Sequence, residues 1–285
     1  MASSPESRAE LAARLKEQPF YKATLESIDP EPRKIFEEYA GIPPAEVLSH
    51  VQAVRDRAWE MFPYPCMGMF TFVKMRIARN PAYGTVLRRL LAKEDNKDKS
   101  TLVDLGCGLG QELRTLIAAG VAPTQLYGVD VRDGFVELGF ELFRDKATMQ
   151  SQFIVADLLN SPSIPAQLRG KMNIVFAGAF FHLFGWDDQL TLSKRAVEML
   201  KPEAGSMIFG NQLGCVKAQE DVVPDVPGRK IYFHDSESFR RLWRIVGEET
   251  GTEWEVQVEV GEMGIDEIKK LKPTLRSLRF AVERL

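Results

Sequence analysis

The residues whose types and spacing are best suited to binding a ligand lie between positions 102 and 112. The run there is Leu-Val-Asp-Leu-Gly-Cys-Gly-Leu-Gly-Gln-Glu. An apolar segment ends there at Asp104, and glycines follow at alternate positions. Glycine has no Cβ, so the backbone can take unusual dihedral angles and a ligand can approach it closely. The N–H groups of a helix that begins directly afterwards would point at that ligand. The run therefore predicts a strand, a glycine turn and a helix that bind a small molecule together.

Two common ligand classes fit this turn poorly. The dinucleotide fingerprint needs its third glycine one position after Gly110. A phosphate-binding P-loop needs Gly-Lys followed by Ser or Thr, which this run lacks. An ordinary structural turn stays open as an alternative, because glycine turns after strands are common in α/β proteins.

Further acids follow apolar runs at the spacing of α/β units. Asp130 ends the run 126–130, about 20 residues after the glycine turn, where α/β nucleotide sites place a carboxylate for the ribose hydroxyls. A carboxylate accepts hydrogen bonds from both hydroxyls of a diol. Asp157 ends a third run, 153–157. The alternative function for Asp130, capping of the next helix, fits Asp133 better.

Residues 173–187 form another candidate segment, at the predicted carboxyl end of a fourth strand. Ala177 and Gly178 are small enough for a ligand to come close, and open α/β sheets bind ligands at this edge. His182 could orient a substrate or act as a general base, because histidine titrates near neutral pH. A structural hydrogen bond is the competing interpretation. Arg132 is the nearest cation in sequence for an anionic acceptor, and a surface ion pair is its alternative.

The stretch 59–70 is rich in aromatic residues and methionine and is broken by Pro63 and Pro65. It either packs the N-terminal helices on the main domain or forms a lid and substrate wall, since methionine and aromatic rings make adaptable apolar pockets. On the second interpretation, Tyr64, Met67 and Phe70 of this stretch bind the substrate. Arg132 and, from the segment 173–187, Phe181 are expected to bind it as well.

Composition excludes several classes of protein. The chain has 285 residues, a net charge of −3 and no basic block, which disfavours nucleic-acid binding. Its three cysteines are far apart and lack a Cys-x-x-Cys pair, so neither a disulfide framework nor a metal site is expected. No apolar run reaches membrane length and the start lacks a signal-peptide pattern, so we expect a cytoplasmic protein without membrane insertion.

Strand and helix patterns alternate from residue 101, which predicts an α/β fold with a mainly parallel sheet covered on both faces. Strands are predicted at 101–105, 125–130, 152–157, 172–178, 206–211, 254–260 and 278–283, and helices at 31–40, 81–92, 110–119, 133–144, 187–200 and 235–250. A helix after Pro43-Pro44 should expose Arg55, and 215–230 reads as a loop. The charged stretch 93–100 suggests a boundary between an N-terminal helical lid, 1–95, and a ligand-binding domain, 96–285.

The alternate glycines with Asp104 and Asp130 resemble motif I and the following acid of class I S-adenosylmethionine (SAM) methyltransferases. Four stretches are similar to the small fungal methyltransferases of meroterpenoid and polyketide biosynthesis, namely 38–43, 55–65, 110–114 and 138–145. The resemblance implies a seven-stranded Rossmann-like sheet with an antiparallel last strand, and SAM as cofactor. The expected SAM-binding residues are Asp104, Gly106, Cys107, Gly108, Gly110, Asp130, Val131, Asp157, Leu158 and Ala177.

The resemblance implies an O-methyltransferase (EC 2.1.1.-) that acts on a bulky, apolar small-molecule carboxylate in secondary metabolism. A carboxylate, with a reference pKa near about 4, needs no base, whereas a phenol near about 10 would profit from one. His182 would then orient a carboxylate or deprotonate a phenol. Phenolic methylation, a nicotinamide oxidoreductase, a non-methylating isomerase or cyclase, and a silent SAM-binding subunit stay open. The oligomeric state is also open, with a homodimer among the options.

Overall fold

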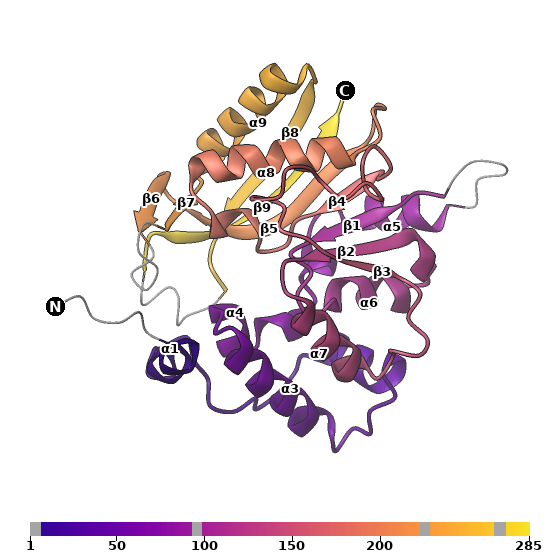
Figure 1. Cartoon of the computed structure of the whole chain (residues 1–285), viewed down its shortest axis with the longest axis vertical. Coiled ribbons are helices and arrows are strands. Elements are labelled where there is room, and N and C mark those ends of the chain that lie inside the picture. The colour runs from indigo at the N-terminus through magenta and orange to yellow at the C-terminus, as the bar shows by residue number, and fades with distance from the viewer. Residues whose placement is uncertain (1–6, 93–98, 223–228, 265–271) are drawn as a thin grey trace.

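A computed structural model describes residues 7–92, 99–222, 229–264 and 272–285. Its main element is a seven-stranded sheet in the order β3-β2-β1-β4-β5-β9-β8 (Figure 1). The strands are β1 Leu102–Leu105, β2 Leu126–Asp130, β3 Gln152–Val155, β4 Ile174–Phe176, β5 Met207–Cys215, β8 Trp254–Gly261 and β9 Leu275–Arg284. Strands β1 to β5 are parallel, whereas β9 is antiparallel to both β5 and β8. The predicted fold class is confirmed.

Helices cover both faces of the sheet because its central strands, such as β1 and β4, are buried and apolar on both sides. Val103 and Leu105 share a core with α8 (Trp186–Met199) and α9 (Ser236–Thr250). Leu102 faces the other way and packs with α5 (Tyr83–Leu91) and α6 (Gln111–Ala118). In Figure 1, α8 and α9 lie above the sheet, and α6 and α7 (Asp133–Phe143) lie below it.

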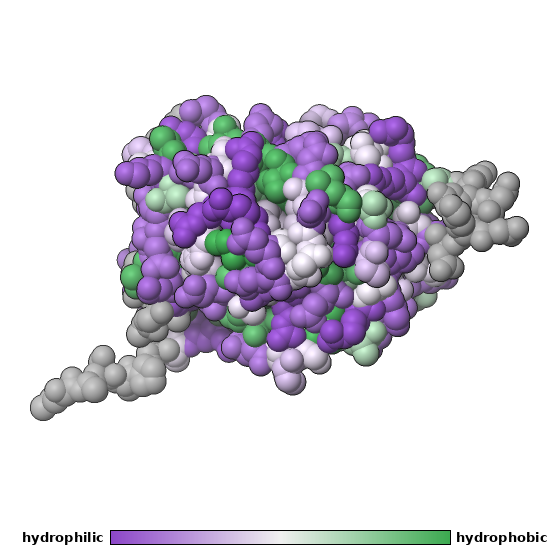
Figure 2. Space-filling model, turned by 90° about the horizontal axis from the view of Figure 1, so that it is seen from above, coloured by the Kyte–Doolittle hydropathy of each residue, from purple (hydrophilic) through white to green (hydrophobic). Residues whose placement is uncertain are grey.

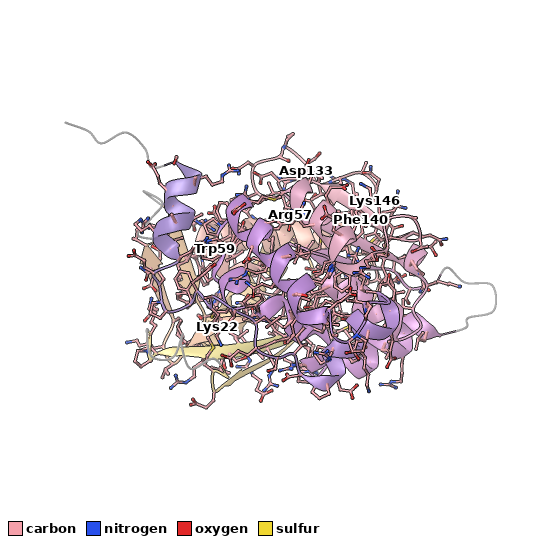
Figure 3. The ribbon with its side chains drawn as sticks, turned by 90° about the horizontal axis from the view of Figure 1, so that it is seen from below. Lys22, Arg57, Trp59, Asp133, Phe140 and Lys146 are labelled. Carbon is pink, nitrogen blue, oxygen red and sulfur yellow. The ribbon has the colours of Figure 1, made fainter. Side chains whose placement is uncertain are left out.

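The N-terminal segments pack against α7 through an apolar core of their own. They are α1 Arg8–Leu15, α2 Pro30–Lys34, η1 Ile35–Tyr39, α3 Val47–Met61, α4 Pro65–Gly68, η2 Thr71–Lys74 and η3 Arg76–Arg79. Figure 3 shows Trp59 and Arg57 on α3, with Arg57 near Phe140 of α7. Trp59 Nε1 donates to the Ala12 carbonyl at 3.0 Å, and Arg57 Nη2 donates to Glu141 Oε1 at 3.0 Å. We refer to residues 7–79 as the N-terminal cap.

Arg55 contradicts the prediction that it would be exposed. Its side chain is 0% exposed, and its guanidinium donates to the carbonyls of Lys22 and Ala23 at 2.9 and 3.0 Å. The guanidinium also lies 3.9 Å above the ring of Phe70. An arginine tolerates burial when carbonyls and aromatic faces satisfy its planar fork, so Arg55 joins the first turns of the cap instead of facing water.

One further prediction was wrong, and one was confirmed. The stretch 215–230 was expected to be a loop, but β5 continues to Cys215, and β6 (Gln219–Val222) pairs with β7 (Lys230–Phe233). The helix expected at 31–40 is divided into α2 and the π-helical η1, and it ends before Gly41, whose φ is +63°. Most of the predicted boundary at 93–100, including the division at 95, lies outside the described residues, so the two-domain division stays a prediction.

The surface carries small apolar groups among polar residues. Seen from above, the face in Figure 2 is mostly hydrophilic, with apolar residues scattered over it. Within the described ranges, each helix is too short or too polar to cross a bilayer.

Candidate cofactor and substrate site

The glycine turn between β1 and α6 requires glycine at each alternate position. Gly106, Gly108 and Gly110 have φ values of +66°, +53° and +67°, in the left-handed region that side chains disfavour. The N–H groups of Gly106 and Cys107 both donate to the Val129 carbonyl, at 2.8 and 3.0 Å, which ties the turn to β2. A Cβ at Gly108 would meet nothing within 4 Å, whereas one at Gly106 would lie 2.8 Å from Phe180. The turn is therefore open to a ligand at its middle glycine.

Arg114 supports this turn from within the protein. Its Nη1 donates to the carbonyls of Leu109 and Gly110 at 3.0 and 3.2 Å. Its Nε and Nη2 bind both oxygens of Asp145, each at 2.8 Å, and the Tyr39 hydroxyl donates to Asp145 Oδ2 at 2.8 Å. Burial and the bond to Asp145 raise the pKa of Tyr39. This buried cluster connects the N-terminal cap to the glycine turn.

No role was predicted for Arg114, Asp145 and Tyr39, because they lie far apart in sequence. Each lies in one of the stretches that carry the family resemblance, 110–114, 138–145 and 38–43. The resemblance therefore contained a signal for the cluster, but it gave no indication that the three side chains meet.

Asp130 is held at the end of β2 by two backbone groups. Its Oδ2 accepts from the Gly108 N–H and its Oδ1 from the Arg132 N–H, both at 2.9 Å. Burial raises its pKa, and the two N–H bonds oppose that shift. Asp133 does not cap α7 as predicted: Arg132 is at the cap position, and Asp133 is the first residue of the helix. Val131, beside Asp130, is 51% exposed.

Asp104 is only 2% exposed, and its Oδ2 has no hydrogen-bond partner among the described residues. Burial raises the pKa of Asp104 well above its usual value, and the charges of Glu112 and Asp130 raise it further. Glu112 is satisfied, because it accepts from the N–H groups of Arg76 and Ile77 at 3.0 and 2.8 Å. Burying a carboxylate without a partner costs free energy. Asp104 is therefore better explained as a binding group for a cationic part of a ligand than as a core residue.

The remaining predicted cofactor residues differ in accessibility. Asp157 is half-buried; its Oδ1 accepts from the N–H groups of Leu159 and Asn160, and the bonds from Asn160 lower its pKa. Leu158 and Ala177 are buried in the core on the α8 side of the sheet. Cys107 is also buried, and burial raises the pKa of its thiol, so it is protonated at neutral pH and unsuited to nucleophilic attack.

His182 lies on η5 (Phe181–Leu183), just after the end of β4. Its Nδ1 is buried and has no hydrogen-bond partner in the part of the chain that the structure describes. Burial and, secondly, the charge of Arg76 lower the pKa of His182 to about 3. The ring is therefore neutral at pH 7 and is a weak base. His234, by contrast, bonds Ser238 and Gln189 at 3.0 and 3.1 Å and serves the core.

The structure separates the predicted substrate-binding residues into two groups. Tyr64 is half-buried, with its ring 5.9 Å from that of Phe135. Arg132 is also half-buried, and its guanidinium lies 4.0 Å from the ring of Phe62. The other three, Met67, Phe70 and Phe181, lie within apolar cores. Tyr64 and Arg132 are thus the members of the set that a ligand can reach without rearrangement.

Two open hollows, each of about 830 Å³, lie away from these groups. One is lined by residues of α8 and α9, including Lys194 and Glu249, and the other by α9 and β8. Neither is lined by a residue of the glycine turn. Among the described residues, no group of three or more His, Cys, Asp or Glu side chains could hold a metal ion. The polar groups that suit a ligand gather instead at the carboxyl edge of β1, β2 and β4.

Comparison with known proteins identifies the kind of site. A family model described as a meroterpenoid methyltransferase N-terminal domain matches residues 20–73, and a methyltransferase domain model matches 102–203. The O-methyltransferase phiE of Fungal sp. (strain ATCC 74256) is 43% identical over 84% of this chain and 78% of its own length. The chain belongs to the meroterpenoid methyltransferase family.

Other relatives agree with this assignment. The methyltransferase prhM of Penicillium brasilianum is 39% identical over 93% of both chains. The asnovolin E/chermesin D methyltransferase nvfJ of Aspergillus novofumigatus is 37% identical over 82% of both. Among solved structures, a phosphoethanolamine N-methyltransferase 2 of Haemonchus contortus in complex with S-adenosylhomocysteine (SAH) has a TM-score of 0.51 at 15% identity, over 81% of this chain and 60% of its own. At that identity the likeness concerns the fold alone.

This meroterpenoid methyltransferase family member is a SAM-dependent enzyme, and the residues at the carboxyl edge fit that cofactor. Gly108 leaves space above the turn, and Asp104 offers an unpartnered carboxylate oxygen. Each Asp130 oxygen accepts one backbone hydrogen bond and keeps a lone pair for a ribose hydroxyl. Val131, next to Asp130, is exposed and open to a ligand.

Proposed function

We propose that this methyltransferase esterifies a carboxylate of a bulky, largely apolar small molecule in meroterpenoid or polyketide biosynthesis. Two relatives, phiE and the Stereocaulon alpinum atr3, are named O-methyltransferases, and nvfJ is named for asnovolin E and chermesin D. The match of the N-terminal cap to a meroterpenoid methyltransferase domain supports the same class of acceptor.

The observation that carries the carboxylate assignment is the state of His182. Its pKa of about 3 makes it a poor acceptor of a phenolic proton. The carboxylates of Asp130 and Glu112 already accept hydrogen bonds from backbone N–H groups. A carboxylate, with a reference pKa near about 4, is ionised at neutral pH without help. The site therefore suits an acceptor that arrives as an anion.

The enzyme's own contribution is alignment. When bound, SAM supplies a methyl group that its sulfonium already activates. The glycine turn and Asp130 fix one reactant, while the cap and His182 border the space for the other. Holding two reactants in a reactive geometry can supply roughly 7–11 kcal/mol of the barrier reduction.

Paired acceptors test this proposal. Terpenoid and aryl-terpenoid skeletons would be offered as the carboxylic acid and as the matching phenol or alcohol. Transfer of the label from methyl-labelled SAM to the product would be measured together with SAH release. We expect methyl ester formation on the acids and little turnover on their partners. The rate should change little with pH above about 5, where the acceptor is ionised. Faster methylation of the phenols would overturn the proposal.

Phenolic methylation is the second candidate, because the unpartnered Nδ1 of His182 could accept a hydrogen bond from a phenol. It predicts a rate that rises with pH and collapses in His182→Ala. A non-methylating cyclase is a third: the [4+2]-cyclase SpnF shares the fold with a TM-score of 0.50 at 14% identity over 70% of this chain and 79% of its own. It, like a silent SAM-binding subunit, would release no SAH.

A further inference from the structure

Arg76 begins η3 and is fixed through its backbone at the edge of the cofactor site. Its N–H donates to Glu112 Oε1 at 3.0 Å, in the first turn of α6. Its carbonyl accepts from Asn211 Nδ2 of β5 at 3.0 Å. The Asn211 carbonyl in turn accepts from the N–H of Ala179, in the loop after β4, at 2.6 Å. Arg76 therefore lies between the helix after the glycine turn and the loop that carries His182.

The chain reaches this position at a conformational cost. Met75, directly before Arg76, has φ +46° and ψ +70°, in the left-handed region that residues with a side chain disfavour. Such residues cost on the order of 1–3 kcal/mol and cluster at functional sites. The hydrogen bonds that the N–H groups of Arg76 and Ile77 donate to Glu112 keep the strained segment in place. This placement makes Arg76 a candidate for a functional role.

The guanidinium of Arg76 is half-buried and makes no hydrogen bond or ion pair with any residue that the structure describes. After burial, the charge of Arg76 is the second cause that lowers the pKa of His182 and of Lys74, so its guanidinium lies near both side chains. Its neighbour Arg79 is different, because Arg79 Nη2 pairs with Asp29 at 2.7 Å. An unpaired, partly desolvated cation at a ligand site indicates an anionic ligand group.

Asp104 is a nearby carboxyl group, close enough for the charge of Glu112 to raise its pKa. Its buried Oδ2 lacks a partner among the described residues, as the Arg76 guanidinium does. A cation and a carboxylate that both lack partners beside one glycine turn match an α-amino acid, which carries both charges on one carbon. We infer that Arg76 binds the α-carboxylate of SAM while Asp104 faces its α-ammonium group.

A carboxylate on the acceptor is the other possible source of the same chemistry. The α-carboxylate of SAM fits better, because it is attached to the same carbon as the ammonium group. Arg76 and Asp104 are correspondingly close together, since both are neighbours of Glu112. An acceptor carboxylate has no reason to lie beside Asp104, whose charge would repel it. The inference depends on the cofactor and is independent of which acceptor is methylated.

Isothermal titration of SAM and of decarboxylated SAM, which lacks only the α-carboxylate, tests the assignment. We expect Arg76→Gln to weaken SAM binding about 10- to 100-fold, the value of a charge-assisted bidentate bond. Decarboxylated SAM should bind the wild type and Arg76→Gln equally. Arg76→Lys should recover part of the SAM affinity, because the charge stays and the fork is lost.

Arg79→Gln is the matched control, since it removes the same charge from the same short helix without touching the site. It should leave both affinities unchanged. The backbone contacts of Arg76 survive substitution of its side chain, and thermal unfolding of each variant checks that the fold is retained. Unchanged SAM affinity in Arg76→Gln would overturn the inference, and a raised acceptor KM in that variant would assign the cation to the acceptor. An equal loss for SAM and decarboxylated SAM would make Arg76 structural.

Discussion

Two arginines near the first turn of α6 contrast with each other. Arg114 is buried and fully paired, with the carbonyls of Leu109 and Gly110 and both oxygens of Asp145. Arg76 is half-buried, and its guanidinium has no partner in the described part of the chain. The first builds the turn, and the second is available to a ligand. Positive charge beside a cofactor site is thus not enough to assign a role; the presence or absence of internal partners distinguishes support from recognition.

The largest effect is expected when Arg114, the arginine that supports the turn, loses its partner. Asp145→Ala leaves the Arg114 guanidinium buried without its carboxylate, which costs about 3–5 kcal/mol of unfolding free energy. Denaturant unfolding measures this loss. Tyr39→Phe removes one hydrogen bond to the same carboxylate and should cost only about 1 kcal/mol. Similar small losses in both variants would mean that the cluster does not support the turn.

If Asp130 binds the ribose, as its position predicts, Asp130→Ala should weaken SAM binding about 100-fold, because it removes that acceptor and leaves the N–H groups of Gly108 and Arg132 without a partner. Titration calorimetry gives the affinity. Asp133→Ala is the matched control, since Asp133 bonds only its neighbour Gly134 among the contacts described. An affinity unchanged in Asp130→Ala would remove the ribose assignment.

Asp104→Asn sharpens the recognition side, because it should lower SAM affinity yet stabilise the ligand-free protein. The pKa of Asp104 is raised in the fold, so between its unfolded and folded pKa the native state binds more protons, and stability falls as pH rises. The unfolding free energy of the ligand-free variant should therefore be about 1–3 kcal/mol higher than that of the wild type near pH 8. This difference should vanish near pH 4. Thermal unfolding across that range measures it. SAM binding by the wild type should also release a proton, visible as a buffer-dependent enthalpy.

His182→Gln is expected to have the smallest effect, about tenfold or less on kcat with SAM affinity unchanged. Because the folded pKa of His182 is about 3, the unfolded chain binds the extra proton below about 6.5, so its contribution to stability is lost as pH falls through that range. His234, with a pKa of about 4, contributes in the same direction. The variant should therefore be less acid-sensitive than the wild type, which unfolding between pH 7 and 4 would show. Equal acid sensitivity would mean that His182 is not buried in solution.

The sequence predicted the sheet and the glycine turn because both depend on local pattern. Apolar runs that end in an acid, such as the one at Asp130, mark strands whose ends must meet at one edge. The roles of Arg76 and Asp145 could not be predicted, because they depend on contacts with residues that are distant in the chain. The prediction that Arg55 is exposed failed for a related reason. The helical pattern around Arg55 gives no information about the distant carbonyls that accept hydrogen bonds from its guanidinium. The cytoplasmic location and the homodimer stay predictions.

The hydrogen bond from Tyr39 connects the N-terminal cap to Asp145, which follows α7 and pairs with Arg114 beneath the glycine turn. The cap of this enzyme is therefore not an independent module that could be exchanged alone. A chimera that imports a foreign residue at position 39 would have to import a compatible residue at 145 as well. Engineers who seek new acceptors should graft the two as a unit, or cofactor affinity will change along with specificity.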